Sequence, residues 1–108
     1  MEYKIVITSD AEADLEGFIR YLLFEKRSEQ AATNLLNDFE VTKRSLSRTA
    51  GSLKLCDNPK LKALGYRRIN FLSHRYFMLY RLERMDAIVD NIFHELQDYE
   101  NNMIYLNR

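Results

Sequence analysis

Residues 65–94 hold most of the side chains in this chain that could do chemistry: arginines and tyrosines alternate with apolar residues, and a histidine ends the stretch. Arginine suits phosphate because its planar, permanently charged group reaches two oxygens at once. Histidine suits proton transfer because its charge changes close to neutral pH. Arg68 and His94 are therefore candidates for a reaction at a phosphate group, although a lone histidine at a strand end is also common as a structural residue. Three further cations could support the charge: Arg67, Arg75 and Arg81.

The charge of the chain is unevenly distributed although its formal total is zero. Residues 1–42 carry a net −5 and residues 85–108 a net −4, whereas residues 43–84 carry a net +9. A cation-rich segment of this size is what a phosphate backbone or an acidic protein partner needs. The alternative is that these long side chains only solvate an exposed loop and a sheet edge.

The size and composition indicate one soluble domain. A chain of 108 residues can build a single hydrophobic core, and no apolar run approaches the roughly 18 residues that cross a membrane. The N-terminus lacks the layout of a signal peptide, so we expect a cytoplasmic protein without a membrane partner. The single cysteine, Cys56, has no partner for an internal disulfide and no metal-ligand spacing around it, so we expect it in a loop, with no metal and no cofactor.

Two helices are predicted in the N-terminal half. Ser9 and Glu12 have the spacing of a capping box, which predicts a helix over 10–25. Ser28 can cap a second helix over 29–48. Because the break between them is short, the two helices should form an antiparallel hairpin whose apolar stripes pack on one sheet.

Four strands and a basic loop complete the predicted elements. A short β-branched run over 3–8 predicts the first strand. Glycine, proline and lysines make 49–64 a long ordered loop. Three strands of a meander then follow over 66–71, 75–82 and 86–93.

Side-chain alternation divides the first meander strand into two faces. Ile69 and Phe71 share the face that we expect to pack on the helices, since side chains alternate across a sheet. Arg68 then points to the opposite face. We expect that face to be uncovered and therefore to carry the function.

The end of the last strand is less determined. Ile88 and Ile92 are in phase with His94, but a strand end can leave the alternation, so register alone does not assign a face to the histidine. Residues 95–108 form a polar tail in which a short helical turn is expected.

The order of these elements, with Tyr66-Arg67-Arg68-Ile69, His74-Arg75-Tyr76, Tyr80-Arg81 and the segment 93–99 in sequence, resembles the RelE/ParE superfamily of bacterial type II toxin–antitoxin toxins over nearly the whole chain. The resemblance implies one α+β domain over 1–108. Its curved, mainly antiparallel sheet would be covered on one face by the helix hairpin.

The resemblance implies one of two activities. RelE-type members are ribonucleases that cut messenger RNA in the ribosomal A site, ParE-type members poison DNA gyrase, and a cognate antitoxin neutralises either type. Our lead interpretation is a ribosome-dependent, metal-independent mRNA endonuclease. The alternatives are a gyrase inhibitor without nuclease activity and a degenerate antitoxin-binding module.

In family ribonucleases a basic residue binds the scissile phosphate, and a C-terminal histidine or tyrosine transfers a proton. Arg68, His94 and Tyr99 stand near those positions and are the expected catalytic residues, with no residue assigned as the general base. The expected RNA-binding residues are Lys60, Lys62, Arg67, Arg75 and Arg81.

Overall fold

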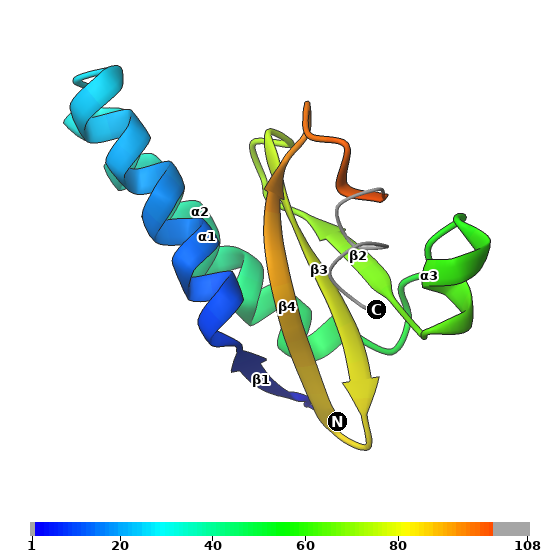
Figure 1. Ribbon diagram of the computed structural model, residues 1–108. Helices are drawn as coiled ribbons and strands as arrows, with labels where there is room; N and C mark the ends of the chain where they lie inside the picture. Colours follow the sequence, from blue (N-terminus) through cyan, green and yellow to red (C-terminus); the bar gives the residue numbers. More distant parts are fainter. Residues whose placement is uncertain (1, 101–108) are drawn as a thin grey trace.

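A four-stranded sheet lies at the centre of the molecule with the two long helices on one side of it, in a computed structural model that describes residues 2–100 (Figure 1). The strands are β1 (Lys4–Ile7), β2 (Arg67–Asn70), β3 (Tyr76–Glu83) and β4 (Asp86–His94), in the spatial order β1-β4-β3-β2. β1 runs parallel to β4, and the other pairs are antiparallel. The predicted α+β class is confirmed, and each predicted strand end lies within one residue of the observed one.

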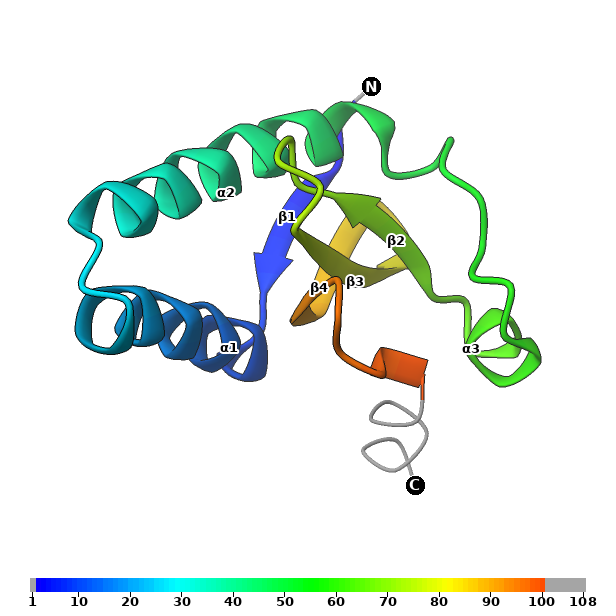
Figure 2. The ribbon, with the colours of Figure 1, turned by 90° about the horizontal axis from the view of Figure 1, so that it is seen from above.

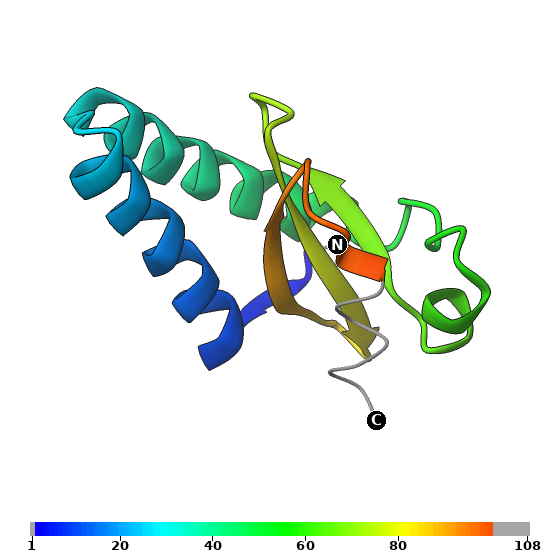
Figure 3. The ribbon, with the colours of Figure 1, turned by 45° about the horizontal axis from the view of Figure 1, so that its top comes forward.

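Two long helical segments lie on one side of the sheet and diverge from each other (Figures 2 and 3). The first is α1 (Ser9–Arg20), continued by a π-helical turn, η1 (Tyr21–Glu25), and the second is α2 (Glu29–Thr49). Both have the apolar stripe that the sequence predicted, and both pack it toward the sheet. None of the helices within residues 2–100 is long and apolar enough to cross a membrane.

The helix starts are fixed by side-chain caps. Ser28 caps α2 as predicted, accepting a backbone N–H of the first turn at 3.1 Å. The cap of α1 is Thr8, one residue before the predicted Ser9, so the predicted capping box is wrong. The Thr8 hydroxyl accepts the backbone N–H of Ala11 at 3.2 Å and donates to the Val89 carbonyl at 3.0 Å. Thr8 is therefore the cap because it bonds both the first turn of α1 and β4.

The main core lies between the helices and the sheet. Leu46 from α2 packs with Met78 and Tyr80 from β3, and all three side chains are fully buried. The Tyr80 hydroxyl donates to the Ala50 carbonyl at 2.7 Å, so this buried polar group is satisfied. Each large apolar side chain buried here contributes about 1.5–3 kcal/mol of transfer free energy.

The face opposite the helix hairpin is also covered, which corrects the expectation of an open face. The predicted loop contains a short helix, α3 (Pro59–Ala63), whose Leu61 is fully buried against this outer face. Alternation in β3 explains the difference, because Phe77 and Leu79 are apolar on this face just as their neighbours are on the other. Six buried residues form the outer cluster: Cys56, Leu61, Tyr66, Phe77, Leu79 and Phe93.

A β-bulge interrupts the pairing of β3 with β4. Val89 and Asn91 pair with consecutive residues of β3, which leaves Asp90 as an extra residue. The bulge puts Val89 and Ile92 on the same face, in the main core. The prediction that Ile88 is in phase with Ile92 is therefore wrong.

The chain leaves β4 through a turn and reaches the outer face. Tyr99 packs there against the outer cluster, and residues 99–100 are helical, in the segment where the sequence predicted a helical turn. The rest of the predicted tail, 101–108, lies outside the described residues.

Candidate functional site

Arg68 lies on the outer face, as predicted, but its guanidinium is packed on aromatic rings. The guanidinium carbon is 3.6 Å from the centre of the Phe77 ring and 5.5 Å from that of Tyr99. Its Nε donates to the side-chain oxygen of Asn70 at 3.0 Å. A stacked guanidinium keeps its charge and the edge of its planar group, so Arg68 can still bind an anion.

Tyr99 shares this site. Its ring meets Phe77 edge to face, with ring centres 5.0 Å apart, and lies tilted against Phe93 at 5.9 Å. Burial raises the pKa of the Tyr99 hydroxyl, an effect that is partly offset by its hydrogen bond with Arg68. A tyrosine with a raised pKa is protonated at neutral pH, so it can donate a hydrogen bond or a proton but is a poor base.

His94 lies on the other face of the sheet. It pairs with Tyr76 at the start of β3, and Tyr76 packs edge to face on the ring of Phe18 in α1 at 5.0 Å. Arg68 pairs instead with Leu79, a residue of the outer cluster. The structure therefore brings Arg68 and Tyr99 together but places His94 on the helix side.

The His94 ring makes two contacts within its own surroundings. It meets the Tyr76 ring edge to face at 5.1 Å, and its Nδ1 accepts the backbone N–H of Leu96 at 3.2 Å. Both contacts have a structural purpose, which is the alternative that the sequence left open for a histidine at a strand end.

Two of the predicted RNA-binding arginines hold the fold together. Arg67 donates to the carbonyls of Gly51 and Leu53 and so fixes the chain that leaves α2. Arg81 donates through Nε to the Asp90 carboxylate at 2.8 Å and also pairs with Glu83 at 3.3 Å. Their charge is used inside the molecule and contributes little to an external anion site.

The other predicted RNA-binding cations are exposed. Lys60 and Lys62 lie on α3, beside β2, and Arg75 lies in the turn before β3. Arg75 borders the helix side of the sheet, whereas α3 covers the outer side. The outer face therefore carries Arg68, Tyr99 and the two lysines of α3.

The bulged residue Asp90 was not predicted as a site residue. Its carboxylate accepts from Arg81 and, at 2.8 Å, from the Tyr66 hydroxyl. Burial, with Asp90 as the next cause, raises the pKa of Tyr66 to about 12. The sequence signal for this network is weak, because an acidic residue inside an apolar strand is recognisable only when its partners are known.

A cavity of about 1120 Å³ lies between the helix hairpin and the edge of the sheet where β3 begins and β4 ends. Its apolar wall includes Phe18, Leu22 and Tyr76, and its other lining side chains include Lys26, Arg75 and His94. Two carboxylates also line it, and each accepts two N–H groups. Asp14 accepts from Asn91 and Ile92, and Asp38 accepts from Leu72 and Ser73.

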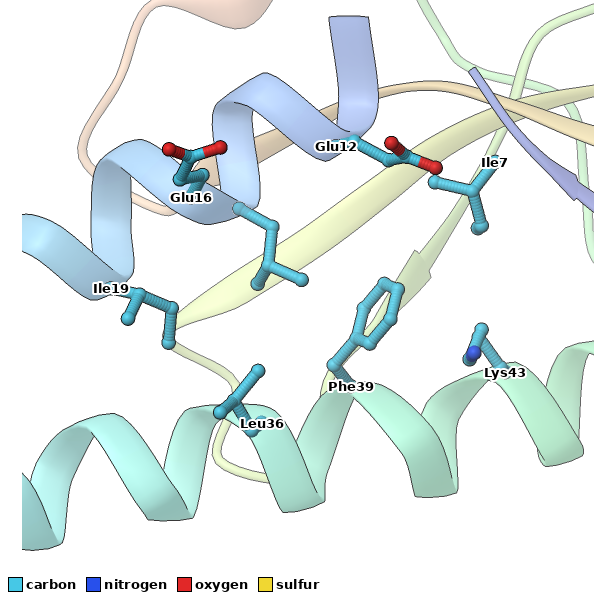
Figure 4. Close-up of a pocket in the computed structure, with 8 residues that line it drawn as sticks. Ile7, Glu12, Glu16, Ile19, Leu36, Phe39 and Lys43 are labelled. Carbon is cyan, nitrogen blue, oxygen red and sulfur yellow. The ribbon is translucent and has the colours of Figure 1, made fainter. Parts of the chain in front are cut away.

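A second cavity, of about 380 Å³, lies between α1 and α2 on the side of β1 (Figure 4). Ile19 from α1, Leu36 and Phe39 from α2 and Ile7 from β1 point into it. Lys43 at its rim pairs with Glu40 at 3.1 Å and lies over the Phe39 ring. This cavity is an apolar slot between diverging helices, far in sequence from Arg68 and Tyr99.

No group of three or more histidine, cysteine, aspartate and glutamate side chains within residues 2–100 could hold a metal ion. Cys56 lies in the loop between α2 and α3, as predicted, but its side chain is buried in the outer cluster, and this burial raises the pKa of its thiol. A thiol of this kind is a weak nucleophile at neutral pH.

Two solved structures of similar fold come from bacterial toxin–antitoxin systems. The chain is similar to one from the chromosomal ParDE toxin–antitoxin system of P. aeruginosa, with a TM-score of 0.67 and 16% identity over 86% of this chain and 96% of the other. It is also similar to a chain of the toxin–antitoxin complex RelBE2 from Mycobacterium tuberculosis, with a TM-score of 0.61 and 18% identity over 88% and 100%. The fold is therefore that of the RelE/ParE superfamily.

The family is shown by the sequence itself. A sequence model described as the ParE toxin of the type II toxin–antitoxin system parDE matches residues 5–99. The chain belongs to this family and is a type II toxin. No curated protein matches the sequence.

Proposed function

We propose that this toxin inhibits DNA gyrase, as the resemblance implies for ParE-type members, and is not a nuclease. The separation of Arg68 from His94 on opposite faces of the sheet carries the proposal. Metal-free RNA cleavage needs a cation and proton-transfer groups around one phosphate, within hydrogen-bond reach of it. His94 cannot serve a phosphate held by Arg68, because the sheet lies between them. The match to the ParE family model supports the same choice.

The proposal is tested with the purified toxin in two reactions. We expect it to inhibit supercoiling of plasmid DNA by gyrase and to leave messenger RNA intact in a translating extract. Arg68→Ala should weaken the inhibition, while Arg44→Ala, an exposed cation of α2, should not. Unaffected supercoiling together with cleaved messenger RNA would show that the proposal is wrong.

The ribosome-dependent mRNA endonuclease remains the second candidate because Arg68 and Tyr99 lie together. The guanidinium carbon of Arg68 is 5.5 Å from the centre of the Tyr99 ring, and the pKa of the Tyr99 hydroxyl is raised. The pair could therefore supply a cation and a proton donor to one phosphate. Under this hypothesis Tyr99→Phe should abolish cleavage in the extract, whereas His94→Ala should have little effect. If both variants lose cleavage, Tyr99 and His94 act together, which requires a conformation other than the one in this structure.

We further propose a cognate antitoxin as the partner that holds the toxin inactive. The solved structures of similar fold come from toxin–antitoxin systems. The 1120 Å³ cavity offers apolar side chains together with the cations Lys26 and Arg75. The two carboxylates that line the same cavity, Asp14 and Asp38, already accept N–H groups of the backbone. An amphipathic, acidic segment of the antitoxin matches this chemistry. Arg75→Glu should weaken the complex in a titration, and Arg44→Glu is the control.

A further inference from the structure

The turn after β4 connects the two faces of the sheet. Glu95 donates its backbone N–H to the Arg75 carbonyl at 2.8 Å, and Gln97 donates to the His94 carbonyl at 3.0 Å. The chain then reaches Tyr99, whose ring covers Phe77 and Phe93 beside Arg68. The shape of this turn therefore decides whether Tyr99 reaches its place on the outer face.

His94 closes the turn with its ring as well as with its backbone. Its backbone N–H donates to the side-chain oxygen of Gln97 at 2.7 Å, and its Nδ1 accepts the N–H of Leu96 at 3.2 Å. A ring nitrogen can accept a hydrogen bond only when it carries no proton, so the neutral ring must bear its proton on Nε2. A protonated ring presents a donor at both nitrogens, and the contact with Leu96 would set one donor against another.

We propose that His94 is an acid-sensitive latch of the C-terminal segment. The neutral ring closes the turn over residues 94–97 and seats Tyr99 on the outer face. Protonation of the ring opens the turn, lifts Tyr99 from Phe77 and exposes the Arg68 guanidinium. Histidine is the side chain whose ordinary charge change lies between about pH 5 and pH 8, and the latch is therefore tested at pH 5.5 and pH 8. The latch does not depend on the target of the toxin.

The hydrogen bond from the Leu96 N–H to His94 Nδ1 lies among other charged and titratable side chains. Asp14 and Asp38 also line the cavity beside His94, but their carboxylates already accept backbone N–H groups. The other charged or titratable side chains around the ring are Lys26, Arg75, Tyr21 and Tyr76, which line the same cavity, and Glu95 and Asp98, which follow His94 in the chain.

The only cysteine reports on the latch. Cys56 is 7% exposed and belongs to the cluster that Tyr99 packs against, so release of Tyr99 should speed its reaction with a disulfide reagent such as 4,4′-dithiodipyridine. His94→Asn is the matched variant, because the Asn oxygen can take the position of Nδ1 and accept the same N–H without titrating.

At pH 5.5 the full-length wild-type protein should react about fivefold faster than His94→Asn, the factor expected from the loss of one hydrogen bond. At pH 8 the two should react at the same rate. In NMR spectra the Leu96 amide and the Tyr99 ring signals should titrate together with the His94 ring in the wild type. His74→Asn, which removes the other histidine, should behave as the wild type does. Equal rates for wild type and His94→Asn at pH 5.5, or a Leu96 amide that does not titrate, would overturn the proposal.

Discussion

Both faces of the sheet are packed, but the side chains that cover them differ in kind. The helix face buries a large apolar cluster that two long helices cover, and the Tyr80 hydroxyl inside it is bonded to a carbonyl. The outer face has a smaller cluster under one short helix, bordered by Arg68 and by the network of Arg81, Asp90 and Tyr66. The first arrangement stabilises the fold, whereas the second also holds the Arg68 guanidinium at its border, where a partner could meet it.

The same substitution on the two faces tests this difference. Leu46 and Leu61 are both fully buried. Leu46→Ala should lower the free energy of unfolding by about 4 kcal/mol, and Leu61→Ala by about 2 kcal/mol, because the short α3 can move into the space left behind. Urea unfolding measures both values. Equal losses would mean that the outer cluster is as rigid as the main core.

The polar network of the outer face should give the next largest effect. Asp90→Ala leaves the Tyr66 hydroxyl and the Arg81 guanidinium without their shared acceptor, which should cost about 2 kcal/mol. Glu83→Ala is the control, since this exposed partner of Arg81 should contribute less than about 0.5 kcal/mol. If both variants unfold at the same urea concentration, the network is not a stabilising feature.

The Asp14 carboxylate, on the helix side of the sheet, should make the free energy of unfolding depend on pH. Burial raises the pKa of Asp14 above 3.8, and the hydrogen bonds from Ile92 and Asn91 lower it to a lesser extent. The folded state then binds more protons than the unfolded state between 3.8 and the raised pKa, so stability falls as the pH rises through this window. Compared with Asp14→Asn, the wild type should gain stability as the pH falls from neutral toward 3.8. A constant difference between the two unfolding curves would contradict the raised pKa.

The smallest effect concerns the stacking of Arg68. Arg68→Lys keeps the charge but replaces the planar group that lies over Phe77, and it should cost about 0.5 kcal/mol. Arg44→Lys on an exposed helix position should cost nothing measurable. A loss for Arg68→Lys as large as that for Asp90→Ala would place Arg68 inside the structural network and not at its border.

The element order was predictable because each element has its own period and its own end signals. The β-branched run of β1, the stripes of α1 and α2 and the turns of the meander lie within the sequence of each element, and the observed bounds agree closely. The position of Arg68 followed from simple alternation in β2, because no irregularity interrupts that short strand.

Other features depend on contacts between distant segments. Thr8 replaces Ser9 as the cap because it also reaches β4, which the local spacing does not reveal. α3 is stabilised by burying Leu61 against a face that sequence reasoning left open. The face of His94 could not be read from the phase of Ile88, because the bulge at Asp90 lies between them.

The bulge in β4 also sets how the chain tolerates changes in length. The bulge holds one residue more than β3 pairs with, so Val89 and Ile92 share a face although they are three positions apart. Removing Asp90 alone would bring them to the two-residue spacing of a regular strand, so Phe93 and His94 would keep their faces while the bonds of the Asp90 carboxylate would be lost. Variation among relatives should therefore tolerate a single deletion at the position of Asp90, whereas a single deletion between the bulge and His94 would send that histidine to the other face.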